Sequence, residues 1–508
     1  MTKIPKIYLI GSGPGDTGLL TIKAQEIIKK CDAIIYDNLI NPDILDLVPD
    51  NAEKIYVGKK ANQHTLKQEE INDLLVCKAR EYKCIVRLKG GDPIIFGRGA
   101  EEAEFIRDHN IEFEIIPGIS SAVAAPIYAG IPLTHRNFCS AFMVLTGHED
   151  PLKEESSINW KNVAEFNGTV VILMGVKNLS NITEKLISLG RNDFEPSAII
   201  YWGTTPDQTV LTARLSDIAN VAKENNIKPP CVFITGDVVN LRDKLNWFEK
   251  LPLFNKKVVI TRPKEQNSYF KSSLKALGAN VIEIPSIKID SVDDFTLIDN
   301  EFNNIKSYDW LIFTSVNGVK HFFNRLYFLN FDSRHLSNIK IATIGNVTKT
   351  ELLKHGIISD FTPDRFLSDE IVKGLNAINE ISGKKILLAR SDISRIEFSE
   401  ALINKGAIVE DLIVYKTLLN QNDGDFIKNT LSINKIDIIT FTSPSTVNNF
   451  IKLVPENYIF NELKETYIAS IGPVTSNKIK ESILKRVDIE ATTHNIDGLL
   501  EAIIKFIN

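Results

Sequence analysis

The sequence predicts an α/β protein made of two halves, each of which forms two lobes. In the first half, short apolar strands repeatedly run into glycine-rich loops, and helical patterns follow these loops. In the second half, one set of strand and loop motifs occurs twice in the same order. Alternating strands and helices are typical of sheets that helices cover on both faces. The length of 508 residues corresponds to about three or four domains of ordinary size.

The composition is that of a soluble globular protein and excludes several other classes. Hydrophobic residues make up 44% of the chain and charged residues 24%, which suits a large core with a polar surface. The net charge of −5 gives no general attraction for nucleic acid or an anionic membrane. No apolar run is long enough for a signal peptide or a membrane span. The 5 cysteines lack a CxxC spacing and the 8 histidines lack HxxxH and HExxH patterns, so we expect a reduced, cytoplasmic protein without a metal site.

The first strand of the chain, residues 6–10, runs into the glycine loop GSGPGD and then into a helical pattern. In this arrangement, backbone N–H groups of the loop can hold a ligand. The second strand, residues 33–36, ends at Asp37. An acid in that place also contacts the ribose in dinucleotide-binding units, so a nicotinamide-dependent enzyme is one alternative. Pro14 interrupts the glycine fingerprint and counts against this alternative.

The stretch of residues 84–105 carries the clearest ligand-binding signal. An apolar run enters the loop Gly90-Gly91-Asp92-Pro93, and paired glycines let a ligand approach the main chain closely. Asp92 can accept hydrogen bonds from hydroxyl or amino groups of a ligand. Acidic residues after Arg98 suit the N-terminal end of a helix. A lone glycine pair would more simply mark a turn, but the whole string favours a ligand-binding loop.

Further strands complete the first half. Residues 113–116 lead into the string PGIS, and the string GIPLTHR is interpreted as a crossing between two lobes. Four later strands end in glycine and are separated by helical segments: residues 141–147, 169–175, 197–203 and 231–236. We therefore expect lobes at about residues 1–134 and 137–248.

Seven strings of the first half, in this order, closely resemble uroporphyrinogen-III C-methyltransferases: GSGPGD, YDNL, VGKK, QEEIN, RLKGGDPIIFGRG, PGIS and GIPLTHR. The resemblance covers residues 4–245. It implies a two-lobed tetrapyrrole-methylase fold that binds S-adenosylmethionine between its lobes, and usually a homodimer. The implied reaction methylates two ring carbons of uroporphyrinogen III and gives precorrin-2, which serves cobalamin or sirohaem synthesis.

The resemblance also implies roles for individual residues. The implied contacts with S-adenosylmethionine are Pro14, Gly90, Gly91, Asp92, Ile95, Ser120, Ser121, Met174 and Gly203. Asp37 matches a proposed proton acceptor, Lys59 a proposed proton donor, and Arg98 a residue that contacts substrate or assists proton removal. Structural roles stay open: Asp37 could cap the next segment, Lys59 could be a solvated surface residue, and Met174 could belong to the core.

An internal repeat organises the second half. Residues 256–262 recur as residues 384–390, and the string FTS recurs as residues 441–443. Duplication on this scale predicts two similar flavodoxin-like α/β lobes with a cleft between them. Each repeated loop places hydroxyl residues and free backbone N–H groups at the start of a helix, and such groups suit carboxylates.

The strings ITRP, DWLIFTSVNGV, IGNVT, VYKT, FTSPSTV and IGPVTS resemble uroporphyrinogen-III synthase over residues 256–508. The resemblance implies one lobe of residues 256–287 with 418–508 and another of residues 288–417, and it leaves residues 249–255 as a linker. The implied reaction cyclises hydroxymethylbilane with inversion of the last pyrrole ring. The candidate residues are Tyr415 and Thr475 for catalysis, and Ser315, Thr348 and Ser443 as donors to substrate carboxylates.

Together, the two resemblances predict a bifunctional enzyme of tetrapyrrole biosynthesis. Its expected partners are small tetrapyrroles and a second copy of the chain that pairs through the methyltransferase half, with no nucleic acid, membrane or metal. Several alternatives stay open. The second half could bind tetrapyrroles without turnover, Tyr415 could only pack, and Arg262 and Arg390 could pair with substrate carboxylates or with acidic residues of the protein.

Overall fold

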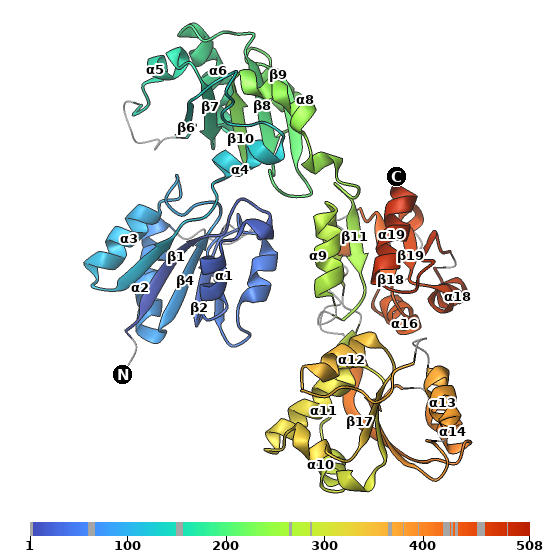
Figure 1. Cartoon of the computed structure of the whole chain (residues 1–508). Coiled ribbons are helices and arrows are strands. Elements are labelled where there is room, and N and C mark those ends of the chain that lie inside the picture. The colour runs from blue at the N-terminus through green and yellow to red at the C-terminus, as the bar shows by residue number, and fades with distance from the viewer. Residues whose placement is uncertain are drawn as a thin grey trace. The chain divides into compact units, whose positions relative to one another are not determined.

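The computed structural model describes the chain apart from residues 1–3, 59–66, 149–155, 264–266, 285–286, 364–367, 379, 395, 420–426, 428–429, 432–434, 455–462 and 485 (Figure 1). Two units are present. Unit 1 consists of Met1–Lys256, Ser273–Asn280 and Ile507–Asn508, and unit 2 consists of Lys257–Ser272 and Val281–Phe506. Each unit contains two sheets of 5 strands. Among the described helices, none combines the length and the apolar character needed to cross a membrane.

The first sheet of unit 1 is parallel and is covered by helices on both faces. Its elements are β1 Lys6–Gly11, α1 Ile22–Ile28, β2 Ala33–Tyr36, β3 Glu53–Tyr56, α2 Gln68–Glu81, β4 Cys84–Lys89, α3 Gly99–Asp108 and β5 Glu112–Ile116. The strand order is β3-β2-β4-β1-β5. Helix α1 packs against one face, and helices α2 and α3 pack against the other (Figure 1). Because the strands are parallel, their carboxyl ends and the loops that follow lie at one edge.

The second sheet of unit 1 is mixed. Its elements are α4 Ser121–Tyr128, β6 Phe142–Thr146, α5 Trp160–Glu165, β7 Thr169–Leu173, α6 Leu179–Ser188, β8 Pro196–Tyr201, β9 Thr209–Arg214, α7 Ile218–Glu224, β10 Cys231–Thr235 and α8 Arg242–Leu245. The order is β6-β7-β10-β8-β9, and β10 is antiparallel to both of its neighbours. Helix α4 packs on one face of this sheet, and helices α5, α6 and α7 pack on the other. The chain therefore reaches the second sheet at α4, before the GIPLTHR segment.

Unit 2 also contains two sheets. The elements of the chain from Lys257 onward are β11 Lys257–Ile260, α9 Ser268–Ala276, β12 Asn280–Glu283, β13 Ile287–Asp290, α10 Thr296–Asn303, β14 Trp310–Phe313, α11 Val316–Phe328, β15 Lys340–Thr343, α12 Asn346–Leu353, α13 Ser368–Ala377, β16 Lys385–Ser391, α14 Glu397–Ile403, β17 Ile408–Leu419, β18 Ile438–Phe441, α16 Pro444–Leu453, β19 Tyr467–Ser470, α18 Pro473–Glu481, β20 Ile489–Glu490 and α19 Ile496–Ile507. The strand orders are β12-β11-β18-β19-β20 and β13-β17-β16-β14-β15. Strand β11, from the first repeat, thus pairs with β18 of the second repeat, while β16, from the second repeat, pairs with β14 of the first.

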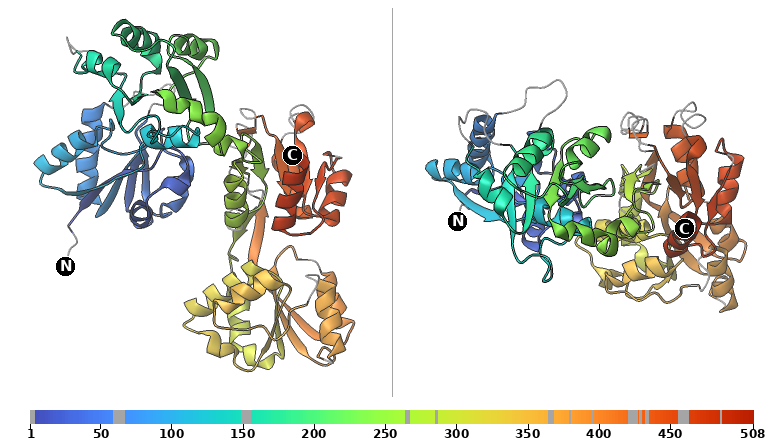
Figure 2. Two further views of the ribbon diagram at one scale, coloured as in Figure 1. Left: turned by 45° about the horizontal axis from the view of Figure 1, so that its top comes forward. Right: turned by 90° about the horizontal axis from the view of Figure 1, so that it is seen from above.

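Helices cover the second sheet of unit 2 on both faces, as the views of Figure 2 and Figure 1 show. Helices α10, α11 and α12 pack on one face, and helices α13 and α14 pack on the other. The predicted α/β class is confirmed in all four sheets. The strands expected before glycine in the first half are confirmed as β6, β7, β8 and β10. Strands β3 and β9 were not predicted, because none of their side chains is more than partly buried and the apolar signal is weak.

Candidate functional site

Three glycine loops of unit 1 converge at the carboxyl edge of its parallel sheet. The Gly13 N–H donates to the Gly91 carbonyl at 3.1 Å, and the Gly91 N–H donates to the Gly13 carbonyl at 2.7 Å. A Cβ atom on Gly118 would lie 2.2 Å from the Gly91 oxygen, and one on Gly11 would lie 2.5 Å from the same oxygen. No side chain fits between these backbones, so the glycines are required by close approach. Gly91 also has a φ of +68°, which suits glycine best.

Asp92 joins two of these loops. One carboxylate oxygen accepts hydrogen bonds from the N–H groups of Ile94 at 2.8 Å and Ile95 at 3.0 Å. The other oxygen accepts from the Gly118 N–H at 3.1 Å. Asp92 therefore orders the loop that contains it and ties this loop to the PGIS segment. A carboxylate offers about four acceptor sites, two on each oxygen, so the oxygen that accepts from Gly118 can still accept one further bond.

A cleft opens beside the converging loops and is lined by residues from both sheets of unit 1. It brings together five of the predicted cofactor contacts: Pro14, Gly90, Gly91, Ser121 and Gly203. Leu39, Trp202 and Cys231 line the same cleft and were not predicted. Burial raises the pKa of the Cys231 thiol to about 12, so this wall of the cleft carries no thiolate at neutral pH. A Cβ atom on Gly203 would lie 2.4 Å from the Ala125 Cβ, which explains the glycine there.

The remaining predicted contacts are Asp92, Ser120, Ile95 and Met174, which are not among the residues that line this cleft. Ser120 is buried and caps α4, accepting a hydrogen bond from the Ala122 N–H at 3.3 Å. Ile95 is exposed in the loop after Asp92. Met174 follows β7, is 49% exposed, and has a φ of 56°. The exposure of Met174 excludes the core alternative for this residue.

Unfavourable backbone conformations occur in the loops before α3, after β7 and after β8. Phe96 and Arg98 in the loop before α3, and Met174, Trp202 and Thr204 after β7 and β8, all have positive φ angles between 45° and 70°. Such angles cost free energy for residues other than glycine, most of all for bulky or β-branched ones. Strained residues of this kind concentrate at functional sites, where the surrounding structure holds them.

A polar link joins the two sheets of unit 1 next to the cleft. The Asp16 N–H donates to the Thr204 hydroxyl at 3.2 Å, and the Tyr128 hydroxyl donates to the Asp16 carboxylate at 2.8 Å. Burial and the neighbouring carboxylate raise the pKa of Tyr128, so its hydroxyl remains a donor. Sequence reasoning missed Thr204 and Tyr128. The unusual φ of 70° at Thr204 could not have been read from the sequence.

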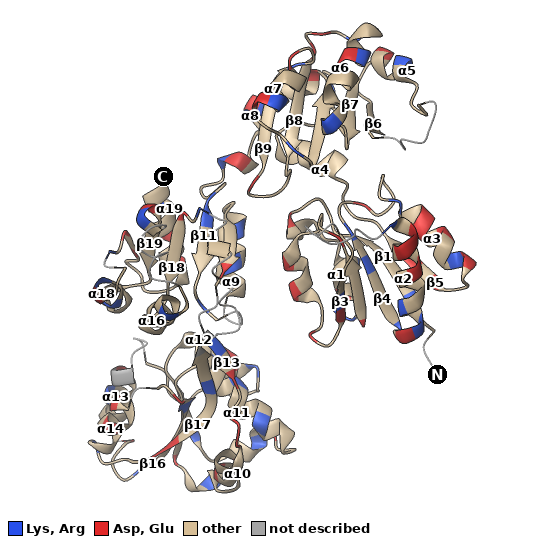
Figure 3. Ribbon diagram, turned by 180° about the vertical axis from the view of Figure 1, so that it is seen from behind, with Lys and Arg blue, Asp and Glu red and all other residues tan. Residues whose placement is uncertain are grey.

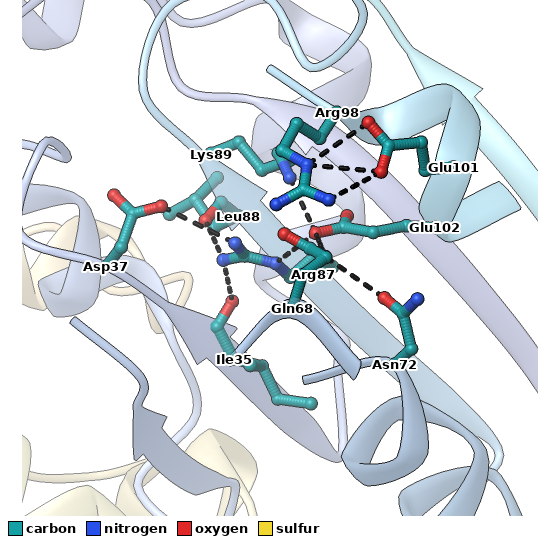
Figure 4. A network of polar contacts seen from close by, with 10 residues as sticks. All are labelled: Ile35, Asp37, Gln68, Asn72, Arg87, Leu88, Lys89, Arg98, Glu101 and Glu102. Atoms are coloured by element: carbon teal, nitrogen blue, oxygen red, sulfur yellow. Dashed lines mark hydrogen bonds and ion pairs between the residues drawn. The ribbon is translucent and has the colours of Figure 1, made fainter. Parts of the chain in front are cut away.

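Asp37 lies at the end of β2 and lines a second pocket together with Tyr36 and Tyr56. One carboxylate oxygen accepts a hydrogen bond from the Leu39 N–H at 3.0 Å, and the other lies 3.5 Å from Nη2 of Arg87. Arg87 belongs to a buried network of charged side chains with Lys89 and Glu102 (Figure 4). The carboxylate is thus held in place while still facing a pocket.

The other predicted catalytic residues of this half differ in their surroundings. Arg98 begins α3, is exposed, and pairs with Glu101 at 2.6 Å, which holds the pKa of Glu101 below its ordinary value. Figure 3 shows the acidic start of α3 in red. Lys59, the predicted proton donor, lies outside the described residues.

In unit 2, Tyr415 and Ser315 meet. Their hydroxyl oxygens lie 3.1 Å apart, and the Ser315 oxygen also caps α11 by accepting a hydrogen bond from the Gly318 N–H at 2.9 Å. Tyr415 is only 7% exposed and belongs to the core on one face of its sheet. The His321 ring stacks on Tyr415 with ring centres 5.5 Å apart, and burial lowers the pKa of His321.

The remaining candidates of unit 2 begin or occupy helices at the repeated loops. Ser443 caps α16, and its hydroxyl also lies 2.9 Å from the Ser445 hydroxyl. Thr348 and Thr475 are buried in the first turns of α12 and α18. Arg390 pairs with Asp411 at 3.0 Å, which favours the protein acid over a substrate carboxylate for this arginine.

Two family models match the chain. Residues 6–219 match the tetrapyrrole (corrin/porphyrin) methylases, and residues 268–501 match uroporphyrinogen-III synthase HemD. The porphyrin biosynthesis protein HemD of Ruminiclostridium josui is 37% identical over 98% of this chain and 97% of its own length. The chain belongs to the family of tetrapyrrole methylases fused to uroporphyrinogen-III synthase. The match of the first half to methylases decides against the nicotinamide-dependent alternative.

Relatives of the methylase half alone are also known. The S-adenosyl-L-methionine-dependent uroporphyrinogen III methyltransferase of Methanosarcina barkeri is 53% identical over 47% of this chain and 94% of its own length. The solved uroporphyrin-III C-methyl transferase of Thermus thermophilus complexed with S-adenyl homocysteine is 38% identical, covers 46% of this chain and 99% of its own chain, and has a TM-score of 0.41. In this methylase–synthase fusion, the cleft of unit 1 lies within the methylase region, and the Ser315–Tyr415 pair lies within the synthase region.

Proposed function

We propose that this fusion protein carries out two consecutive steps of tetrapyrrole biosynthesis. The synthase half cyclises hydroxymethylbilane to uroporphyrinogen III, and the methylase half transfers two methyl groups to that product to give precorrin-2. The match to both family models and the full-length relative support this proposal. We further propose a cytoplasmic homodimer whose product serves cobalamin or sirohaem synthesis.

The cleft lined by Gly90, Gly91 and Gly203 is the observation that carries the methyltransferase proposal. The glycines leave backbone N–H and carbonyl groups bare, so a polar ligand such as S-adenosylmethionine can approach the main chain closely. Pro14 and Ser121 line the same cleft, and Asp92, Ile95, Ser120 and Met174 are the further proposed contacts with the cofactor. When bound, S-adenosylmethionine supplies an electrophilic sulfonium methyl group.

The residues of the methylase half align and deprotonate the substrate. A reduced pyrrole carbon is nucleophilic, and transfer needs chiefly that this carbon is held in line with the methyl group. The ring then loses a proton to restore conjugation, and the half-buried Asp37 carboxylate is the proposed acceptor. The Arg98 side chain is exposed and pairs with Glu101 at 2.6 Å, and we assign it to the carboxylates of the substrate.

The Ser315–Tyr415 pair is the corresponding candidate in the synthase half. Cyclisation begins when hydroxide leaves hydroxymethylbilane, and a proton donor that meets the departing oxygen lowers this barrier. The Tyr415 hydroxyl, held by Ser315 at 3.1 Å, is our candidate for this donor. Thr475, buried in the first turn of α18, is the second catalytic candidate. Thr348 and Ser443 lie at helix starts, where hydroxyl and N–H groups suit the substrate carboxylates.

The test supplies the full chain with hydroxymethylbilane under anaerobic conditions, with and without S-adenosylmethionine, and analyses the macrocycles by mass spectrometry and isomer separation. We expect the type III macrocycle without the methyl donor and its dimethylated form with it. Spontaneous type I macrocycle alone would show that the second half only binds. The methyltransferase assignment would be overturned if the type III macrocycle stays unmethylated in the presence of S-adenosylmethionine and uroporphyrinogen III supplied directly also stays unmethylated.

A further inference from the structure

A cluster of charged side chains is buried beneath Asp37, between the parallel sheet of unit 1 and helices α2 and α3. Arg87 and Lys89 alternate along β4 and therefore point to the same face of the sheet. Arg87 is 3% exposed, Lys89 is 6% exposed, and Glu102 on α3 is 0% exposed. Burying a charged side chain is unfavourable unless the charge is closely paired, and apolar residues of similar size in the same place are often as stabilising. Stability alone therefore does not explain this cluster.

Glu102 is the anchor of the cluster. Its Oε1 accepts from Nζ of Lys89 at 2.6 Å, from Nε2 of Gln68 at 3.1 Å and from Nε of Arg87 at 3.3 Å (Figure 4). Its Oε2 is buried and finds no hydrogen-bond partner within the described part of the chain. Gln68 is itself held by Asn72 at 3.0 Å. Helices α2 and α3 thus fix the position of the carboxylate that faces the two cations.

Arg87 connects this anchor to the edge of the sheet. Its Nη1 donates to the Leu88 carbonyl at 3.0 Å and lies 3.5 Å from the Ile35 carbonyl, and its Nη2 lies 3.5 Å from the Asp37 carboxylate. The guanidinium group is planar and its N–H donors point in fixed directions. The hydrogen bonds made by Nε and Nη1 therefore also set the direction in which Nη2 points. Asp37 is the more exposed partner, at 24% of its side chain.

Asp37 is consequently held at both oxygens. The Leu39 N–H fixes one oxygen at 3.0 Å, and Arg87 faces the other, while the carboxylate lines the pocket with Tyr36 and Tyr56. We propose that Arg87, anchored by Glu102, is a positioning residue that directs the Asp37 carboxylate toward the substrate for proton removal. This inference rests on the proposed role of Asp37 as proton acceptor. Lys89 supplies the second positive charge, so that the two cations balance Glu102 and Asp37.

The test compares Arg87→Gln and Arg87→Lys with Arg191→Gln in the full chain. Arg191 is a matched control, since it is a buried arginine of unit 1 that bonds to Glu195 and to backbone carbonyls away from the cleft. Uroporphyrinogen III is supplied directly at saturating S-adenosylmethionine, and kcat is corrected for the folded fraction. Binding of S-adenosylhomocysteine is measured by calorimetry.

We expect Arg87→Gln to lower kcat by about 10- to 100-fold, because small misplacements of a reacting group have effects of that size. The KM for uroporphyrinogen III and the Kd for S-adenosylhomocysteine should change by less than about twofold, because Arg87 touches neither ligand directly. Arg87→Lys keeps the charge without the fork and should give an intermediate kcat. Arg191→Gln should leave kcat unchanged. A kcat for both Arg87 variants equal to that of Arg191→Gln would overturn the inference.

Asp37→Asn separates the inference from the proposed function. If Asp37→Asn keeps the wild-type kcat, the proton-acceptor role fails whatever Arg87 does. If Asp37→Asn lowers kcat and Arg87→Gln keeps the wild-type kcat, only the positioning role fails. In the double variant, we expect no loss of kcat beyond that of Asp37→Asn, because coupled residues are not additive. If kcat of the double variant falls below that of Asp37→Asn by the full factor seen for Arg87→Gln alone, Arg87 acts independently of Asp37. If Arg87→Gln does not fold, Arg87→Lys with and without Asp37→Asn provides the same comparison.

Discussion

Replacing Gly118 with alanine tests whether the three glycine loops meet as closely as described. The new Cβ atom would lie 2.2 Å from the Gly91 carbonyl oxygen, 2.7 Å from the Gly11 Cα and 2.8 Å from the Gly11 carbonyl carbon. All of these neighbours are backbone atoms, which cannot rotate away as a side chain can. Overpacking in a dense interior costs typically about 1–3 kcal/mol, and we expect Gly118→Ala to reach the upper end of this range.

The assay is thermal unfolding of the full chain, with the methylase transition identified by its shift on adding S-adenosylhomocysteine. For a unit of this size, about 3 kcal/mol corresponds to a fall in Tm of roughly 6–12 °C. The loops also form the cleft, so the Kd for S-adenosylhomocysteine should rise at least tenfold. Formation of the type III macrocycle should not change, because unit 2 carries the Ser315–Tyr415 pair.

Gly190→Ala is the matched control. A Cβ atom on Gly190 would meet no atom within 4 Å, and the φ of +102° leaves only a backbone cost, which we expect to be about 1 kcal/mol. Ligand binding should be unaffected. If Gly118→Ala melts and binds like the wild type, the loops do not converge as described and the steric reasoning is refuted.

Three further predictions concern single side chains. Tyr415→Phe should slow type III macrocycle formation while changing the free energy of unfolding by only about 1 kcal/mol, because one hydrogen bond to Ser315 is lost; an unchanged rate would leave Tyr415 as a packing residue. Cys231 should resist iodoacetamide at pH 8 while the exposed Cys77 reacts, because burial raises the pKa of Cys231 to about 12. Equal labelling of the two cysteines in peptide mass spectra would contradict this prediction. Burial lowers the pKa of His321 below 6.5, so the unfolded chain binds this proton first and stability should fall as pH drops from about 6.5 through the lower, folded pKa. His321→Gln should flatten that part of the stability profile, and denaturant unfolding at pH 7.5 and 5.5 measures it.

Local sequence signals located the cleft but not the interactions within it. Gly90 and Gly91 were predicted as a ligand-binding loop from a strand, a glycine pair and a helix start that are adjacent in the chain. Asp92 was predicted to face a ligand, and its carboxylate also orders the main chain of two loops. The partner in that second role, Gly118, lies 26 positions away, and no local pattern predicts such a contact.

The buried charge cluster was missed for a different reason. Lysine and arginine are almost always exposed, so Arg87 and Lys89 in the string CIVRLK gave no reason to expect burial. A signal was present, because two cations alternate along a strand whose other residues are apolar, which places both on one face. Their anchor, Glu102, was interpreted only as favourable for the helix dipole.

The sequence by itself determined the α/β class, the glycine loops, the duplication in the second half and the family resemblance of both halves. These features depend on residues that are neighbours in the chain, where periodicity and turn preferences act directly. Only the tertiary structure decided that β10 runs antiparallel to both of its neighbours, that Gly203 packs against Ala125, and that Arg87 faces Asp37. Strand order and side-chain burial depend on residues far apart in the chain, and these meet only when the sheets and their helices have packed.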